Sequence, residues 1–135
     1  MITIIRMLPL MVILLIHPNT FQVSTDWVAP KSADEIINPL SGNAQAIVQG
    51  KQLFTNMCAV CYGNTGKGNG AAGVALKPKP ADFLSAKIRK ESDGALYWKL
   101  TQGKAPMASY QAALSDQQRW ELINYIRELE RKYKD

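Results

Sequence analysis

Residues 50–70 of this chain read GKQLFTNMCAVCYGNTGKGNG. The only two cysteines, Cys58 and Cys61, are three positions apart. In a helical turn this spacing places both side chains on the same side, where they can hold one object together. A glycine-rich loop, residues 63–70, follows directly. The cysteine pair and the loop behind it therefore form the chemical centre of the sequence.

Four uses of such a cysteine pair compete. A structural zinc site needs four ligands, and the chain has no further cysteine. A thioredoxin-like dithiol needs a βαβ unit, of which the sequence gives no sign. A disulfide between Cys58 and Cys61 suits an exported protein. The fourth use is a pair of thioether bonds to haem, whose signature C-x-x-C-H is altered here because Tyr62 takes the fifth position.

Two further motifs lie downstream of the cysteines. Residues 68–73 nominally form G-x-G-x-x-G, but no strand precedes them, so a tight irregular loop is favoured over a dinucleotide site. Met107, in the turn Ala-Pro-Met-Ala, is a candidate soft thioether ligand for iron, although a methionine alone more often fills a core. Pro106 strengthens the ligand interpretation because it fixes the backbone that presents the sulfur.

The hydrophobic periodicity predicts a helical domain with no internal repeat. We expect helices over residues 44–57, capped by Asn43, over 93–102, stopped by Gly103, and over 116–133, capped by Ser115. Gly50 lies inside the first helix, where glycine costs about 1 kcal/mol relative to alanine, and so marks a close approach by another element.

The N-terminus has the pattern of a secretory signal. Arg6 precedes an apolar run, residues 7–16, that is shorter than the roughly 20 residues needed to cross a membrane. We expect residues 1–24 to be a signal peptide, 25–43 an extended arm and 44–135 the domain, with an uncleaved membrane anchor as the alternative. The only histidine, His17, lies in this first segment, so its removal leaves a mature protein without histidine.

Composition and charge limit the class of protein. With 47% hydrophobic and 20% charged residues, the chain can bury one core and is not a disordered protein. A net charge of +5 suggests an acidic partner rather than a nucleic acid. Lysines are frequent between the cysteine pair and Met107, and they form either a basic rim that steers such a partner or an ordinary solvated surface. These residues are Lys67, Lys77, Lys79, Lys87, Lys90, Lys99 and Lys104.

Taken in order, these motifs resemble a class I c-type cytochrome (a monohaem cytochrome c domain) over roughly residues 43–129. Each motif is weak alone, whereas their order and spacing are specific. The series is GKQLF at 50–54, CxxC at 58–61, GNTGKGNG at 63–70, LKPKPADF at 76–83, DGALYWK at 93–99, GKAPM at 103–107, and LSD at 114–116 followed by Trp120 and NYI at 124–126.

The resemblance implies an all-α, cytochrome c-like fold in which the N- and C-terminal helices cross around one haem. It implies that Cys58 and Cys61 attach haem c covalently and that Met107 is the distal iron ligand. It further implies that Gly50 lets the two helices approach and that Phe54 packs near Tyr125. Thioether plus imidazole ligation raises the haem potential and suits outer-sphere electron transfer.

Tyr62 departs from the family pattern, in which this position holds the proximal histidine. Three explanations stay open. The phenolate binds ferric iron, which makes Tyr62 and Met107 the two candidate metal ligands and requires the haem to shift, because a phenol oxygen reaches farther than an imidazole nitrogen. Alternatively, the iron lacks this ligand and is open to small molecules. In the third case the domain has lost haem and Cys58 is joined to Cys61.

The resulting expectation is a one-electron carrier and not an enzyme, exported to the periplasm or anchored facing it, that docks an acidic redox partner. The alternatives are a haem-based sensor or weak peroxidase with an open iron site, and a haem-free interaction domain held by the Cys58–Cys61 disulfide.

Overall fold

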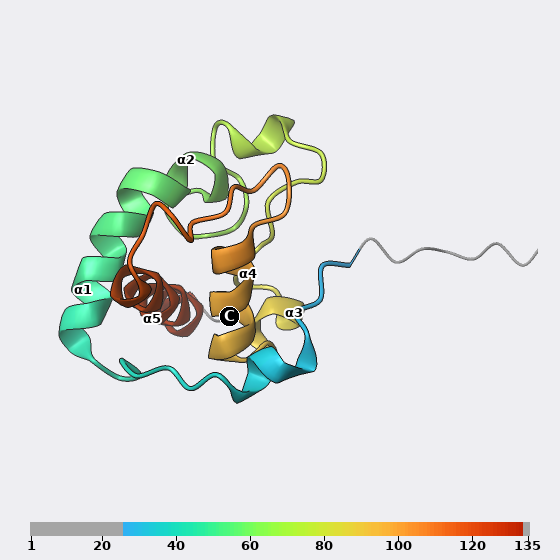
Figure 1. Cartoon of the computed structure of the whole chain (residues 1–135). Coiled ribbons are helices and arrows are strands. Elements are labelled where there is room, and N and C mark those ends of the chain that lie inside the picture. Colours follow the sequence, from blue (N-terminus) through green and yellow to red (C-terminus); the bar gives the residue numbers. More distant parts are fainter. Residues whose placement is uncertain (1–25, 134–135) are drawn as a thin grey trace, which may run out of the picture.

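The structure, a computed structural model, describes residues 26–133, so the expected signal segment and His17 lie outside the described part. Within that part the chain forms helices, and the only β-type pairing is an isolated bridge between Lys104 and Met107. The all-α fold is therefore confirmed (Figure 1). The elements are η1 (Lys31–Glu35), α1 (Ala44–Leu53), η2 (Phe54–Cys58), α2 (Ala59–Tyr62), η3 (Gly73–Ala75), α3 (Ala86–Arg89), α4 (Asp93–Gln102) and α5 (Asp116–Lys132).

Helices α1 and α5 cross at Gly50, and their contact is the centre of the core (Figure 1). A Cβ atom on Gly50 would lie 1.9 Å from the carbonyl oxygen of Glu121, so no larger residue fits without moving α5. Phe54 is 1% exposed and packs edge-on against Tyr125, with ring centroids 5.3 Å apart. Both contacts agree with the crossing of the N- and C-terminal helices that the family resemblance implied.

The first helix continues farther than the sequence predicted. It was expected to end at Met57, but a π-helical turn, η2, connects α1 to α2 and extends the helix to Tyr62. The wide turn is closed by the Ala59 N–H, which donates to the Phe54 carbonyl. Because Phe54 and Cys58 are both buried, the turn directs both side chains into the core. Single π-turns of this kind are frequent at functional sites.

The predicted ends of the later helices are confirmed. Helix α4 spans Asp93–Gln102 and stops at Gly103, whose φ of 66° is a conformation that glycine adopts readily. Helix α5 starts after Ser115, which forms a capping box with Gln118.

The segment 26–43, expected to be an extended arm, contains the short 3₁₀ helix η1 and packs on α4 (Figure 1). The Asn38 side-chain amide donates to Asp93 at 2.8 Å. A Cβ atom on Gly94 would lie 2.0 Å from the carbonyl oxygen of Ala33, so the arm rests directly on the α4 backbone. The arm is therefore part of the packed domain.

None of the helices in residues 26–133 combines the length and apolar character needed to span a membrane.

Candidate functional site

The four residues singled out in the sequence come from two segments that the fold brings together. Cys58 ends η2, Cys61 and Tyr62 lie in α2, and Met107 lies in the turn after α4. The contact between the segments is direct, because the Tyr62 hydroxyl donates to the Met107 Sδ at 3.3 Å. Figure 1 shows the turn after α4 beside α2. Residues 45 positions apart in the chain thus form one site.

The glycine-rich loop holds the end of α2 in place. Its backbone N–H groups donate to the last carbonyls of the helix, from Gly68 to Tyr62 at 2.9 Å and from Gly70 to Cys61 at 3.0 Å. A Cβ atom on Gly70 would lie 2.4 Å from the Val60 carbonyl oxygen, so the loop needs glycine to approach this closely. These contacts satisfy helix-end carbonyls that otherwise lack partners. The loop is thus a tight irregular one, as expected, with its N–H groups directed at α2.

The turn that carries Met107 is also fixed by its backbone. Met107 and Lys104 exchange two backbone hydrogen bonds, of 2.9 and 3.0 Å. The Tyr110 N–H then donates to the Leu100 carbonyl in the last part of α4. The thioether is therefore presented from a closed turn attached to α4.

Both cysteines are free thiols, and burial differs between them. Cys58 is buried and Cys61 is partly exposed. Burial, and secondarily the nearby Cys61, raises the pKa of the Cys58 thiol to about 12, so it stays protonated at neutral pH. No group of three or more His, Cys, Asp or Glu side chains in residues 26–133 is placed to hold a metal ion. The pair is therefore not part of a zinc site built from those residue types.

Tyr62 lies beside two other aromatic side chains, Phe83 and Tyr110. Phe83 stacks on the Tyr62 ring, with centroids 4.5 Å apart and an interplanar angle of 13°. Burial raises the pKa of Tyr62, with smaller contributions from Cys58, Tyr110 and Cys61, so the phenol is neutral and can donate a hydrogen bond. No local sequence pattern assigns Phe83 and Tyr110 to this site, because their placement depends on how the loops fold.

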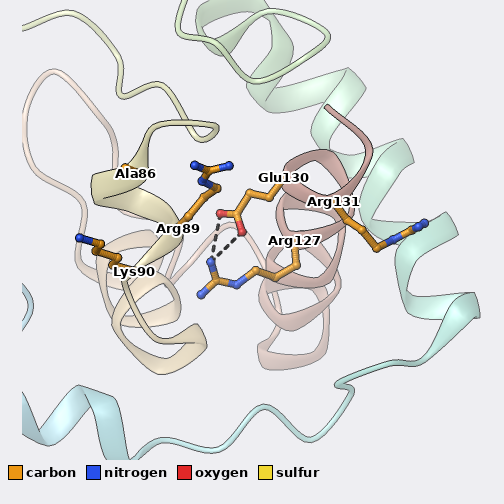
Figure 2. A pocket seen from close by; sticks show the side chains of 6 residues that line it. All are labelled: Ala86, Arg89, Lys90, Arg127, Glu130 and Arg131. Atoms are coloured by element: carbon orange, nitrogen blue, oxygen red, sulfur yellow. Dashed lines mark hydrogen bonds and ion pairs between the residues drawn. The ribbon is translucent and has the colours of Figure 1, made fainter. Parts of the chain in front are cut away.

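Two surface cavities formed by the described residues lie elsewhere. One, of about 480 Å³, lies between α3 and the end of α5, where Arg127 forms an ion pair with Glu130 (Figure 2). The other, of about 390 Å³, is lined mainly by amide side chains from the beginnings of α1 and α5. The cysteine site contributes no residue to either cavity.

Three of the four site residues, Cys58, Cys61 and Met107, have the side chains that a covalently attached haem needs. Two free thiols three positions apart match the two thioether bonds, and Met107 supplies a soft sulfur ligand. Two partly buried aromatic side chains that pack against the core, Phe83 and Tyr110, lie beside Tyr62 and supply apolar lining of the kind haem needs. Tyr62 is the fourth residue, and in this structure it contacts Met107 directly.

A family model described as Cytochrome c matches residues 47–130. Among solved structures, the chain is similar to one from the reducing HAO-like protein complex of Kuenenia stuttgartiensis, with a TM-score of 0.60 and 28% sequence identity. The similarity covers 70% of this chain and 49% of that one, so this chain spans about half the length of the structure it matches. No curated protein sequence matches the chain significantly.

Proposed function

The chain belongs to the cytochrome c family, whose members carry covalent haem c and transfer electrons, and on that premise we propose that Cys58 and Cys61 are its two attachment residues. Met107 is the side chain that binds the iron from the turn after α4. The observation that carries this proposal is the convergence of the free cysteine pair and the fixed thioether on one site.

When bound, haem supplies a one-electron couple between ferric and ferrous iron. Cys58 and Cys61 would attach it, and Met107 would present its sulfur to the iron. A thioether ligand favours the ferrous state and raises the potential. Because Cys58 is buried and Cys61 is partly exposed, one edge of the site faces solvent, where a partner protein can approach.

An acidic redox partner fits the charge around that edge. Residues 57–81 contain three lysines and no acidic residue, and Lys67, Lys77 and Lys79 are all exposed. Two of the lysines that the sequence grouped with them contribute less, because Lys87 pairs with Asp26 and Lys99 pairs with Glu91. The rim proposed for docking is therefore formed by Lys67, Lys77 and Lys79, together with Lys104, which is exposed in the turn that carries Met107.

We also propose that the protein acts outside the cytoplasm, in the periplasm or anchored facing it. This rests on the apolar run 7–16 behind Arg6, which has the pattern of a secretory signal.

The decisive experiment is the intact mass and visible spectrum of the protein produced together with c-type maturation enzymes. We expect a mass increase of one haem that survives acid–acetone extraction, and its loss when Cys58 and Cys61 are both changed to alanine. An unmodified chain two hydrogens lighter than the reduced form would instead indicate a disulfide and would contradict the proposal.

A further inference from the structure

The cavity between α3 and the end of α5 is lined mainly by positive charge (Figure 2). Arg89 and Lys90 line it from the end of α3, and Arg127 and Arg131 line it from α5. Glu130 is the one carboxylate among the lining residues. The volume of about 480 Å³ falls within the range of small-molecule sites. The cavity therefore has the size and the charge to receive a small anion.

Two of the four cations already have carboxylate partners, but they are held with different firmness. Arg127 forms ion pairs with Asp93 at 2.7 Å and with Glu130 at 2.9 Å, and all three side chains are at most 28% exposed. Arg131 pairs with Glu128 at 2.6 Å through a side chain that is 75% exposed. Exposed ion pairs contribute little to stability. Arg127 is therefore committed to the fold, whereas Arg131 can turn to another anion at little cost.

Arg89 and Lys90 carry the charge that is left over. Both are exposed, and within residues 26–133 neither side chain forms an ion pair. The four cations stand against three carboxylates, the lining residue Glu130 and the two partners outside the lining, so one positive charge is in excess. A guanidinium group offers a planar fork of donors that matches an oxyanion, and an ammonium group adds a point charge.

Glu130 is the group that opposes an anion in this cavity. Its carboxylate accepts two hydrogen bonds from Arg127 Nη1, at 3.0 and 2.9 Å, and its charge also interacts with Arg89. Figure 2 shows the carboxylate on the side of the cavity toward both guanidinium groups. A bound anion shares Arg89 with this carboxylate and is repelled by it. Removing the charge of Glu130 should therefore strengthen binding in the cavity and leave other anion sites unaffected.

We infer that the cavity between α3 and α5 binds a small oxyanion with two or more negative charges, held by Arg89 and Lys90 and joined by Arg131. Phosphate compounds and polycarboxylates share this chemistry, and pyrophosphate and citrate are their probes. None of the four residues of the cysteine site lines the cavity, so this binding does not depend on the proposed haem attachment.

The test is isothermal titration calorimetry of pyrophosphate, and separately of citrate, into the full chain at pH 7. The variants are Arg89→Gln and Glu130→Gln. Lys51→Gln is the matched control, because it removes the same charge as Arg89→Gln from an exposed position in α1, which contributes nothing to the cavity. The probe that binds more tightly to wild type identifies phosphate or carboxylate as the preferred group.

We expect one site in wild type and about tenfold weaker binding in Arg89→Gln, the loss that follows from one charge-assisted hydrogen bond. Glu130→Gln should bind about threefold more tightly, because a repelling charge is gone. Lys51→Gln should stay within about twofold of wild type in about 0.1 M salt, where distant charges are screened. Circular dichroism melting of each variant checks that it is folded before the titration.

Three results would overturn the inference: no saturable binding of either probe to wild type, equal losses in Arg89→Gln and Lys51→Gln, or weaker binding in a folded Glu130→Gln. Equal losses would mean that anions respond only to the net charge of +5. If Glu130→Gln does not fold, because Arg127 loses a partner, Lys90→Gln takes its place. It should weaken binding by about threefold, and an unchanged affinity in that variant would contradict the site.

Discussion

At the scale of single residues, the proposed iron ligand Met107 would set the reduction potential of the protein. Replacing it with leucine keeps the apolar volume and removes the sulfur. We expect the reduction potential of Met107→Leu to fall by on the order of 0.1 V, within the roughly 0.8 V that axial ligands span. Protein-film voltammetry measures the change. Met57→Leu is the matched control, since Met57 is also partly buried against the core, and a similar fall in that variant would contradict the assignment of Met107.

Gly50 makes a second residue-scale prediction, on stability. In Gly50→Ala the new methyl group meets the Glu121 carbonyl, and α5 has to move. We expect the free energy of unfolding to fall by about 3 kcal/mol, at the upper end of the usual cost of overpacking. Urea denaturation measures it. Val48→Ala, in the same helix but 51% exposed, is the control and should change stability little. Equal losses in the two variants would mean that the helix crossing does not depend on Gly50.

The four site residues could be predicted from the sequence, whereas the side-chain contacts around them could not. Cys58, Cys61, Tyr62 and Met107 were all selected by residue type, spacing and family resemblance, and the fold brings them together. The Phe83 stack on Tyr62 was not predicted, because no local pattern links residues 21 positions apart in a loop. The short contact between Tyr62 and Met107 was not predicted either, since it depends on how far the phenol reaches across the folded site.

At the scale of elements, the start of α5 is tied to α4 through Asp116. Its carboxylate accepts a hydrogen bond from the Tyr97 hydroxyl at 2.9 Å and pairs with Arg119. The Tyr97 hydrogen bond, followed by the Arg119 contacts, lowers the pKa of Asp116 below its usual range. A lowered pKa in the folded state means that the ionised carboxylate stabilises the fold above the unfolded pKa, near 4, and that this contribution disappears as the pH falls through the folded pKa.

We therefore expect Asp116→Asn to melt at a lower temperature than wild type at pH 7. The difference should shrink as the pH falls below about 4, because the wild-type carboxyl then becomes protonated. Thermal denaturation followed by circular dichroism at pH 7, 4 and 3 measures it. Glu35→Gln, at an exposed carboxylate in η1, serves as the control. A difference that stays constant across this range would show that Asp116 acts through shape and not through charge.

Some features of the helices follow from the local sequence, whereas others depend on tertiary contacts. The bounds of α4 and the cap of α5 were predicted because Gly103, Ser115 and the side chains near them act within one helical turn. The π-turn η2 was missed because it arises from burying Phe54 and Cys58 together. The packing of η1 on α4 was missed because it depends on Gly94, whose lack of a side chain matters only once the arm lies against it.

At the scale of the whole molecule, positive charge is distributed unevenly, and its position should matter more than its amount. Lys67 lies in the glycine-rich loop that contacts α2, and Lys77 and Lys79 follow η3, in a stretch without acidic residues. Changing all three to glutamate lowers the formal net charge by six, from +5 to −1. The matched control changes Lys31, Lys90 and Lys132 to glutamate, which gives the same net charge but alters η1, the segment after α3 and the end of α5.

We expect the first variant to be oxidised by hexacyanoferrate(III), an anion, about tenfold more slowly than wild type at low ionic strength, because its site no longer attracts negative charge. Stopped-flow absorbance measures the rate, and the difference should largely vanish at 1 M salt, where the Debye length is about 3 Å. The control variant should lose much less, since its new charges lie in or next to elements that carry none of the four site residues. Equal slowing in both variants would mean that net charge alone governs the approach, and the lysine rim would then have no part in selecting an acidic partner.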